Sequence, residues 1–229
     1  MKAVIQLELA LTTGTDPLQT VVRVAIEGLK VKIAYVDKEP IIDESAYIAP
    51  TAVVRGEVRI GAGTAVLFGA VISAEGGRVE IGADCVVMEN AVIRGTPKHP
   101  AIIGDRVLVG PHAHLSGCNV ERDSFLATGS TVFNGAVIER GSEVRVNGTV
   151  HVNTRLKKSS TVPIGWIAVG DPAQCLPPSE HDKIWEIQRE LNFPDTVWSV
   201  KREVSQGERT KLFARALARH RDDSVIDDQ

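Results

Sequence analysis

The sequence has few aromatic residues and no uninterrupted apolar run long enough to span a membrane. Aromatic residues make up 4% of the chain, whereas the apolar fraction is 43%. We therefore expect a core of small and β-branched side chains. No window approaches about eighteen uncharged apolar residues, so we expect no membrane-spanning helix.

Cysteine is also scarce, and neither sign of charge is in large excess. Cys85, Cys118 and Cys175 are odd in number and lack a Cys-x-x-Cys spacing. This pattern fits a reducing compartment better than a disulfide framework, so we predict a cytoplasmic protein. The net charge is −3, and the mixing of basic and acidic residues predicts no binding to nucleic acid or to a membrane surface. A small molecule or another protein is the expected partner.

What the sequence does contain is a six-residue repeat of aliphatic side chains. A period of six matches neither a half-buried strand nor an amphipathic helix. The repeat consists of four runs in which every sixth residue is Ile, Val or Leu. Two short insertions and one step of five residues separate these runs. These positions are Ile42, Ile48, Val54, Ile60, Val66, Ile72, Ile81, Val87, Ile93, Ile103, Val109, Leu115, Val120, Leu126, Val132, Ile138, Val144, Val150, Leu156 and Val162.

This repeat predicts an all-β solenoid, a parallel β-helix of about seven coils over residues 41–178. Each coil has three faces, and every sixth side chain points into a triangular prism. Neighbouring coils would be spaced like β-strands, at about 4.8 Å. The insertions around residues 73–80 and 94–102 are expected at corners, where loops commonly line the functional face.

Three further segments flank the predicted solenoid. Residues 1–40 are expected to form a β-rich N-terminal extension. Residues 179–221 have the apolar spacing of helices, so we predict a C-terminal helical segment. Residues 222–229 are expected to be a disordered tail.

Four segments resemble the γ-class carbonic anhydrase-like branch of the hexapeptide-repeat, or isoleucine-patch, superfamily. They read IDESAYIAPTAVV, IGADCVVMENAVIR, IIGDRVLVGPHAHLSGC and VPIGWIAVGDPAQ. The resemblance covers residues 40–198 and implies left-handed winding and a homotrimer. Since the superfamily also contains acyl-CoA-dependent acyltransferases, the fold alone does not determine the chemistry.

The resemblance also implies a zinc ion held between subunits by three histidines. Such a site lowers the pKa of the zinc-bound water to about 7. The positions that match the three ligands are Arg94, Pro111 and Ser116. Arginine does not deprotonate in proteins and proline has no side-chain donor atom. We therefore predict that the inherited zinc site is lost and expect no cofactor.

The positions that support the zinc site in the family differ as well. Ser73, Glu75 and Met88 match the arginine, aspartate and glutamine of the family motifs, and Glu89 matches the following acid. A misalignment could explain one missing ligand, but it does not explain concerted replacement across three coils. Glu75 and Glu89 remain candidate catalytic carboxylates.

Two histidines within the second ligand motif leave a rival interpretation open. His112 and His114 are two residues apart, and on one extended face they could join Glu89 or another histidine in a relocated metal site. Alternatively, both are solvent-facing or corner residues at a subunit interface. We favour the second interpretation and keep both histidines as candidate ligand-binding residues.

A column of side chains is predicted on one face of the prism. Arg94, Ser116, Phe133 and His151 each directly follow an inward residue of that face. Arg94 is a candidate for binding a carboxylate or phosphate, together with Ser116. His151 is a candidate general base for acyl transfer. The alternative is a polar subunit interface.

The sequence thus predicts a γ-carbonic anhydrase-like trimer that lacks the usual zinc site. It would be a ligand-binding or assembly protein, with a small-molecule ligand at a subunit interface. The two alternatives are an acyl-CoA-dependent acyltransferase and a carbonic anhydrase with a relocated metal site.

Overall fold

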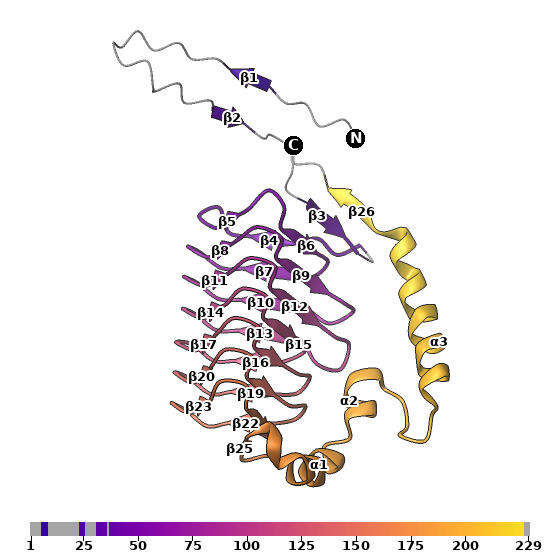
Figure 1. The fold of residues 1–229 in the computed structure, drawn as a ribbon. Coiled ribbons are helices and arrows are strands. Elements are labelled where there is room, and N and C mark those ends of the chain that lie inside the picture. The colour runs from indigo at the N-terminus through magenta and orange to yellow at the C-terminus, as the bar shows by residue number, and fades with distance from the viewer. Residues whose placement is uncertain (1–5, 9–22, 26–30, 36, 227–229) are drawn as a thin grey trace.

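The structure, a computed structural model, describes residues 6–8, 23–25, 31–35 and 37–226. Most of this chain winds into a triangular prism of stacked coils, followed by helices (Figure 1). The first face of the prism is a seven-stranded parallel sheet. Its strands are β4 (Ile41–Ile42), β7 (Val58–Ile60), β10 (Val79–Ile81), β13 (Ala101–Ile103), β16 (Asn119–Val120), β19 (Val137–Ile138) and β22 (Arg155–Leu156).

The second face is also a seven-stranded parallel sheet. Its strands are β5 (Tyr47–Ile48), β8 (Ala65–Val66), β11 (Val86–Val87), β14 (Leu108–Val109), β17 (Phe125–Leu126), β20 (Glu143–Val144) and β23 (Thr161–Val162). One strand from each face completes a coil, so each strand pairs with the strand one coil away.

The third face is a ten-stranded sheet. In spatial order its strands are β26 (Ser224–Ile226), β3 (Val31–Ala34), β6 (Val53–Arg55), β9 (Val71–Ala74), β12 (Val92–Gly95), β15 (His114–Ser116), β18 (Thr131–Val132), β21 (Thr149–Val150), β24 (Ile167–Val169) and β25 (Gln174–Leu176). The terminal strands β26 and β25 are antiparallel to their neighbours. The architecture confirms the predicted left-handed parallel β-helix with C-terminal helices.

The six-residue repeat fills the interior of the prism, as predicted. On the third face Val54 pairs with Ile72, Ile72 with Ile93, and the same register continues to Val150. All twenty repeat positions except Ile42 are buried, and Ile42 packs against the core at the end of the prism. Aliphatic side chains therefore stack on one another from coil to coil and remove a continuous apolar column from water.

Both insertions leave the strand register intact. The loop between β9 and β10 and the loop between β12 and β13 protrude at one corner, while Ile93 still pairs with Ile72 and Leu115. In the second loop Thr96 and His99 exchange backbone hydrogen bonds of 2.8 and 3.0 Å. The loops therefore add surface next to the third face without disturbing the core.

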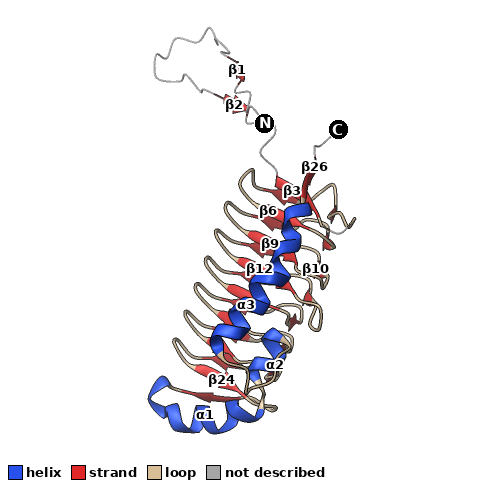
Figure 2. Ribbon diagram, turned by 90° about the vertical axis from the view of Figure 1, so that its right-hand side faces the viewer, coloured by secondary structure: helices blue, strands red, loops and turns tan. Residues whose placement is uncertain are grey.

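The chain after the prism turns back along it. The 3₁₀ turn η1 (Pro178–Glu180) and helix α1 (His181–Glu190) lie at the C-terminal end of the prism, and α2 (Phe193–Trp198) follows. Helix α3 (Gln206–Leu217) then runs along the outside of the third face toward its N-terminal end (Figure 2). The 3₁₀ turn η2 (Ala218–Asp222) connects α3 to β26. We call residues 206–226 the C-terminal strap.

The ends of the chain differ from the sequence-based boundaries. Strand β3 pairs with β6, so the third face begins before residue 41. Residues 224–226, expected in a disordered tail, form β26, because the short Ser-Val-Ile segment pairs with the open edge of β3. Of the expected N-terminal extension, β1 (Gln6–Glu8) and β2 (Arg23–Ala25) form an antiparallel pair. Residues 1–5, 9–22, 26–30, 36 and 227–229 lie outside the described residues.

Two further sequence-based expectations concern membranes and cysteines. In the described part of the chain, no helix is long and apolar enough to cross a membrane. Cys85, Cys118 and Cys175 are all free thiols. Burial raises the pKa of the Cys118 thiol to about 12, which favours the inert packing role of a small buried residue.

Candidate functional site

Arginine and serine alternate along the third face on four successive strands. Arg55, Ser73, Arg94 and Ser116 each follow an inward repeat residue, and the register pairs each of them with the next. The predicted adjacency of Arg94 and Ser116 is confirmed. Because neighbouring strands are about 4.8 Å apart, the backbones of the two arginines are separated by about 10 Å. We call these four residues the arginine–serine column.

Toward the C-terminus the column continues as an aromatic cluster. The rings of Phe133 and His151 are 5.9 Å apart, and Phe193 of α2 lies 5.5 Å from each of them. Trp198, at the end of α2, packs edge-on against Phe193 at 5.3 Å. His151 is only 6% exposed. Helix α2 therefore covers the histidine that the sequence suggested as a general base.

The environment of His151 favours packing over proton transfer. Burial lowers the pKa of His151 to about 4. Its Nδ1 atom is buried without a hydrogen-bond partner among the described residues. An efficient general base needs a pKa near the working pH and access to the substrate proton. Neither condition is met while α2 remains in place.

The buried imidazole predicts a pH-dependent stability. The folded-state pKa of about 4 lies below the ordinary 6.5. The neutral, buried His151 therefore contributes its full stability above pH 6.5. This contribution is lost as the pH falls from 6.5 through the folded-state pKa of about 4. At about 1.4 kcal/mol per pKa unit, we expect the unfolding free energy to drop by about 2 kcal/mol between pH 7.5 and 5. Urea denaturation at these two pH values measures it.

The matched control is His151→Phe, which keeps an aromatic ring in the cluster but cannot titrate. The variant should lose about 2 kcal/mol less than the unmodified protein over the same pH interval. Equal pH dependence in the two proteins would contradict the burial of a neutral histidine at this position.

Arg94 has no ion pair within the described part of the chain, in contrast to Arg55. Its Nε atom is buried and has no hydrogen-bond partner within the described chain. Ser73 and Ser116 flank it on the neighbouring strands, and both are buried. Burial and then the charge of Arg94 lower the pKa of His114. This part of the third face is therefore electropositive and offers donors for an anion.

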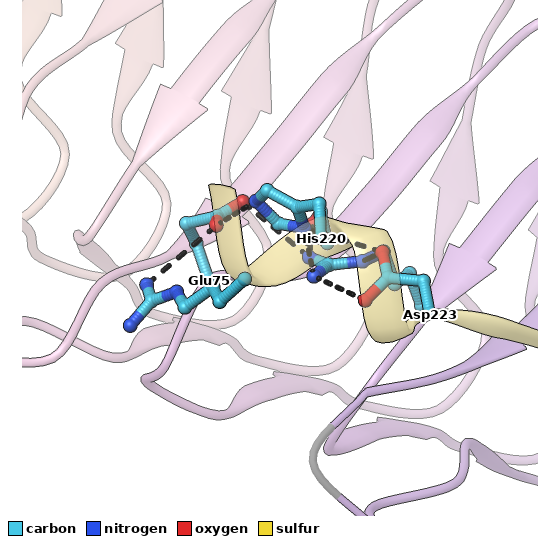
Figure 3. Close-up of polar contacts among 6 residues, drawn as sticks. Glu75, His220 and Asp223 are labelled. Carbon is cyan, nitrogen blue, oxygen red and sulfur yellow. Dashed lines mark hydrogen bonds and ion pairs between the residues drawn. The ribbon is translucent and has the colours of Figure 1, made fainter. Parts of the chain in front are cut away.

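Arg55, in contrast, is fully engaged with groups of its own chain (Figure 3). Its side chain is 7% exposed. Its Nε and Nη2 atoms donate to the two carboxylate oxygens of Asp223, at 2.6 and 3.2 Å. Nη1 donates to Ser73 Oγ at 3.1 Å and to Glu75 Oε2 at 3.4 Å. The guanidinium carbon also lies 3.9 Å from the centre of the Tyr35 ring.

The candidate carboxylate Glu75 belongs to the same group of contacts. Its Oε1 atom lies 2.6 Å from His220 Nε2 and 3.7 Å from Arg219 Nη2. The other ring nitrogen of His220, Nδ1, contacts Arg55 Nη2 and lies 3.2 Å from Asp223 Oδ2. The strap residues thus bind Glu75 and Arg55 together. We call the group the latch: Arg55, Ser73, Glu75, Arg219, His220 and Asp223.

The three positions that match the family's zinc ligands do not supply zinc donors. Arg94 and Ser116 lie side by side on β12 and β15, and Pro111 lies in the turn before β15. A guanidinium does not deprotonate, proline has no side-chain donor, and a serine hydroxyl is a poor zinc ligand compared with imidazole. The donor chemistry at these positions therefore does not fit zinc.

The rival metal site loses the extended geometry on which it was based. His112 lies in a corner turn with a φ of 56° and is exposed, whereas His114 is half-buried on β15. The backbone N–H of His112 donates to the carbonyl of Glu89 one coil away, at 3.0 Å. The two histidines therefore do not share one strand. In the described chain, no three His, Cys, Asp or Glu side chains are grouped as metal ligands.

Sequence reasoning did not include Arg55 and the residues of the strap in the site. Arg55 follows the repeat residue Val54 just as Arg94 follows Ile93, so extending the column by two coils would have found it. His220 and Asp223 lie 165 and 168 residues from Arg55 in the sequence. Their contacts with the prism depend on the path of α3. The six-residue repeat ends before α3 and does not predict that path.

Comparison with known proteins points to one superfamily. The chain is 35% identical over 146 residues to Gamma carbonic anhydrase 1, mitochondrial, of Arabidopsis thaliana, covering 61% of this chain and 51% of the relative. It is 27% identical over 161 residues to carnitine operon protein CaiE of Escherichia coli, covering 69% and 78%. The chain spans about half the length of Gamma carbonic anhydrase 1 and Gamma carbonic anhydrase 2 of Arabidopsis thaliana. No family model matches the sequence.

Solved structures agree on the fold. The UDP-N-acetylglucosamine acyltransferase of Francisella novicida superposes with a TM-score of 0.50 at 17% identity, covering 82% of this chain and 86% of that one. At this identity the similarity shows the stacked-coil fold and nothing about chemistry. The curated relatives and the repeat support a γ-carbonic anhydrase-like member of the hexapeptide-repeat superfamily.

Proposed function

We propose that this protein binds a small anionic ligand at Arg94 and Ser116 and is not a conventional zinc CO₂ hydratase. The carrying observation is the buried Arg94 Nε, which has no hydrogen-bond partner among the described residues and lies between two buried serines. An anion with carboxylate or phosphate oxygens would accept hydrogen bonds from the guanidinium and from both hydroxyls. Charge-assisted bonds of this kind would compensate the partial burial of Arg94.

The same residues argue against chemistry at an inherited zinc centre. A zinc ion at Arg94 would face a permanent positive charge with no histidine at any of the three matching positions. The acyltransferase alternative needs an accessible base, and the cover of Phe193 over His151 does not support it. A ligand-binding role is therefore the function that these residues support best.

We also propose that the protein is a homotrimer. On the second face Tyr47 is 50% exposed and Phe125 is 37% exposed, and Phe68, in the corner turn after β8, is 50% exposed. Large apolar side chains on one sheet face are typical of surfaces covered by a partner. Light scattering distinguishes a trimer from a monomer of 24.7 kDa, and a monomer would contradict this proposal.

Replacing Arg94 tests the anion site. We expect acetate and inorganic phosphate to bind the unmodified protein, and Arg94→Ala to weaken binding by about 10- to 100-fold. This range follows from a loss of about 1.5–3 kcal/mol for a hydrogen bond to a charged group. Isothermal titration calorimetry measures the affinity of each variant.

The control is Arg59→Ala, because Arg59 is an exposed arginine on β7 of the first face. It should leave both affinities unchanged. Arg94→Lys should retain part of the affinity, since lysine keeps the charge but not the planar fork. Equal binding by the unmodified protein and Arg94→Ala, or no binding by either, would overturn the proposed function.

A further inference from the structure

The arginine–serine column holds two arginines, and among the described residues only Arg55 is bound by a carboxylate. Arg55 and Arg94 occupy equivalent positions two strands apart, with Ser73 paired to both. Arg55 is bound by a carboxylate from the C-terminal strap, whereas Arg94 has no such partner in the described chain. The third face therefore provides an arginine beside a serine at both positions. The difference is that a carboxylate of the strap binds Arg55.

We propose that Asp223 occupies a second anion subsite, formed by Arg55 and Ser73, and that a ligand with two anionic groups displaces it. The proposal rests on anion binding at Arg94, which supplies the first subsite. Backbone positions about 10 Å apart suit a small molecule whose two carboxylates are separated by a flexible chain. The ligand class is therefore a dicarboxylate or a similar dianion.

The contact between Asp223 and Arg55 has the geometry of a bound ligand. Two nitrogens of the guanidinium donate to the two oxygens of one carboxylate, at 2.6 and 3.2 Å. This is the paired arrangement by which arginine recognises free carboxylates. Ser73 Oγ accepts from Nη1 of the same guanidinium at 3.1 Å, and its hydroxyl proton is free to point toward a bound anion.

Asp223 is a carboxylate at neutral pH, as this role requires. Burial alone would raise its pKa, but the hydrogen bonds and charges of Arg55 and His220 outweigh burial and hold the pKa below the ordinary value. Arg55 also contacts Glu75, so two acids share one guanidinium when the strap is closed. When Asp223 is displaced, Glu75 stays bound to Nη1 of Arg55. The Nε and Nη2 atoms of Arg55 then become free to bind a ligand.

The strap that carries Asp223 packs loosely. Helix α3 has no buried residue, and Leu212 and Phe213 are each 42% exposed. Beyond the latch, the strap is held near its end by the three residue pairs between β26 and β3 and at its start by Arg209, which donates to the Arg202 carbonyl and lies over the Trp198 ring. Segments with few buried apolar contacts open at low free-energy cost. Competition between a ligand and the strap is therefore energetically accessible.

The experiment compares Asp223→Asn with Asp222→Asn, using adipate as a two-carboxylate probe and acetate as a one-carboxylate probe. Asp222 is the adjacent exposed acid of η2 and does not contact Arg55 in the described structure. Asparagine keeps the shape of Asp223 but removes its charge. We expect Asp223→Asn to bind adipate about tenfold more tightly than the unmodified protein, with unchanged acetate affinity. Asp222→Asn should match the unmodified protein.

Two further measurements make the outcomes distinct. Adding Arg55→Gln to Asp223→Asn should abolish the gain for adipate, and hydrogen exchange of the β26 amides in the unmodified protein should accelerate with adipate but not with acetate. Equal adipate affinity in Asp223→Asn and the unmodified protein would overturn the second subsite while leaving acetate binding at Arg94 intact. If acetate did not bind, but Asp223→Asn still bound adipate more tightly in a way that required Arg55, the first subsite alone would be overturned. Failure of both probes in every variant would overturn both.

Discussion

Val132→Asp is expected to abolish the folded state under ordinary conditions. Val132 is fully buried and stacks between Leu115 and Val150 inside the prism. A carboxylate there would be charged without a partner, or would have to be protonated at a large free-energy cost. We expect a loss of more than about 4 kcal/mol in unfolding free energy, which belongs to the exceptional range for single substitutions. Thermal melting and the yield of folded protein measure it.

Thr131→Asp is the matched control, because Thr131 is the preceding residue of the same strand and points to the outer side. Its effect on melting should be small, within about 1 kcal/mol, since a carboxylate there remains hydrated. If Val132→Asp melted at the same temperature as the unmodified protein, the inward register of the whole third face would be wrong.

Protein prepared with ample zinc is expected to contain far less than one equivalent of zinc per subunit and to hydrate CO₂ at the background rate. The reason is coordination chemistry at the three matching positions. Arg94 brings a permanent charge, Pro111 has no side-chain donor, and Ser116 is a poor ligand compared with imidazole. Elemental analysis and a stopped-flow hydration assay measure the two quantities.

Restoring zinc should require Arg94→His, Pro111→His and Ser116→His together. A variant with one or two histidines keeps an incomplete set of ligands. Even the triple variant should hydrate CO₂ slowly, because altered supporting residues typically lower affinity or activity by about 10- to 100-fold. Stoichiometric zinc in the unmodified protein, lost in His112→Ala or His114→Ala, would instead establish a relocated site.

The sequence predicted the interior of the prism because each coil imposes the same requirement on every sixth residue. A single polar residue at Ile93 or Leu115 would interrupt stacking with both neighbouring coils, so the pattern is repeated and visible. The adjacency of Arg94 and Ser116 followed from the same register. Local periodicity therefore sufficed for the fold and for half of the arginine–serine column.

The cover over the column could not be predicted in this way. Phe193 packs on His151, and Asp223 binds Arg55, across long intervals of sequence that have no repeat. Such contacts depend on the direction in which the chain leaves the prism, and a helical apolar spacing does not fix that direction. His151 shows the consequence, because a histidine expected in an open column is enclosed by aromatic rings.

The reversed strands at the two ends of the third face also protect the protein from polymerisation. A stack of parallel coils has open edges, and the last coil of one molecule would offer hydrogen-bonding groups to the first coil of another. Strands β25 and β26 each pair with the terminal parallel strand in the opposite direction. A coil of a second molecule, stacked in parallel on either end, would meet a short strand that runs in the opposite direction. End-to-end fibre growth is thereby discouraged along this face.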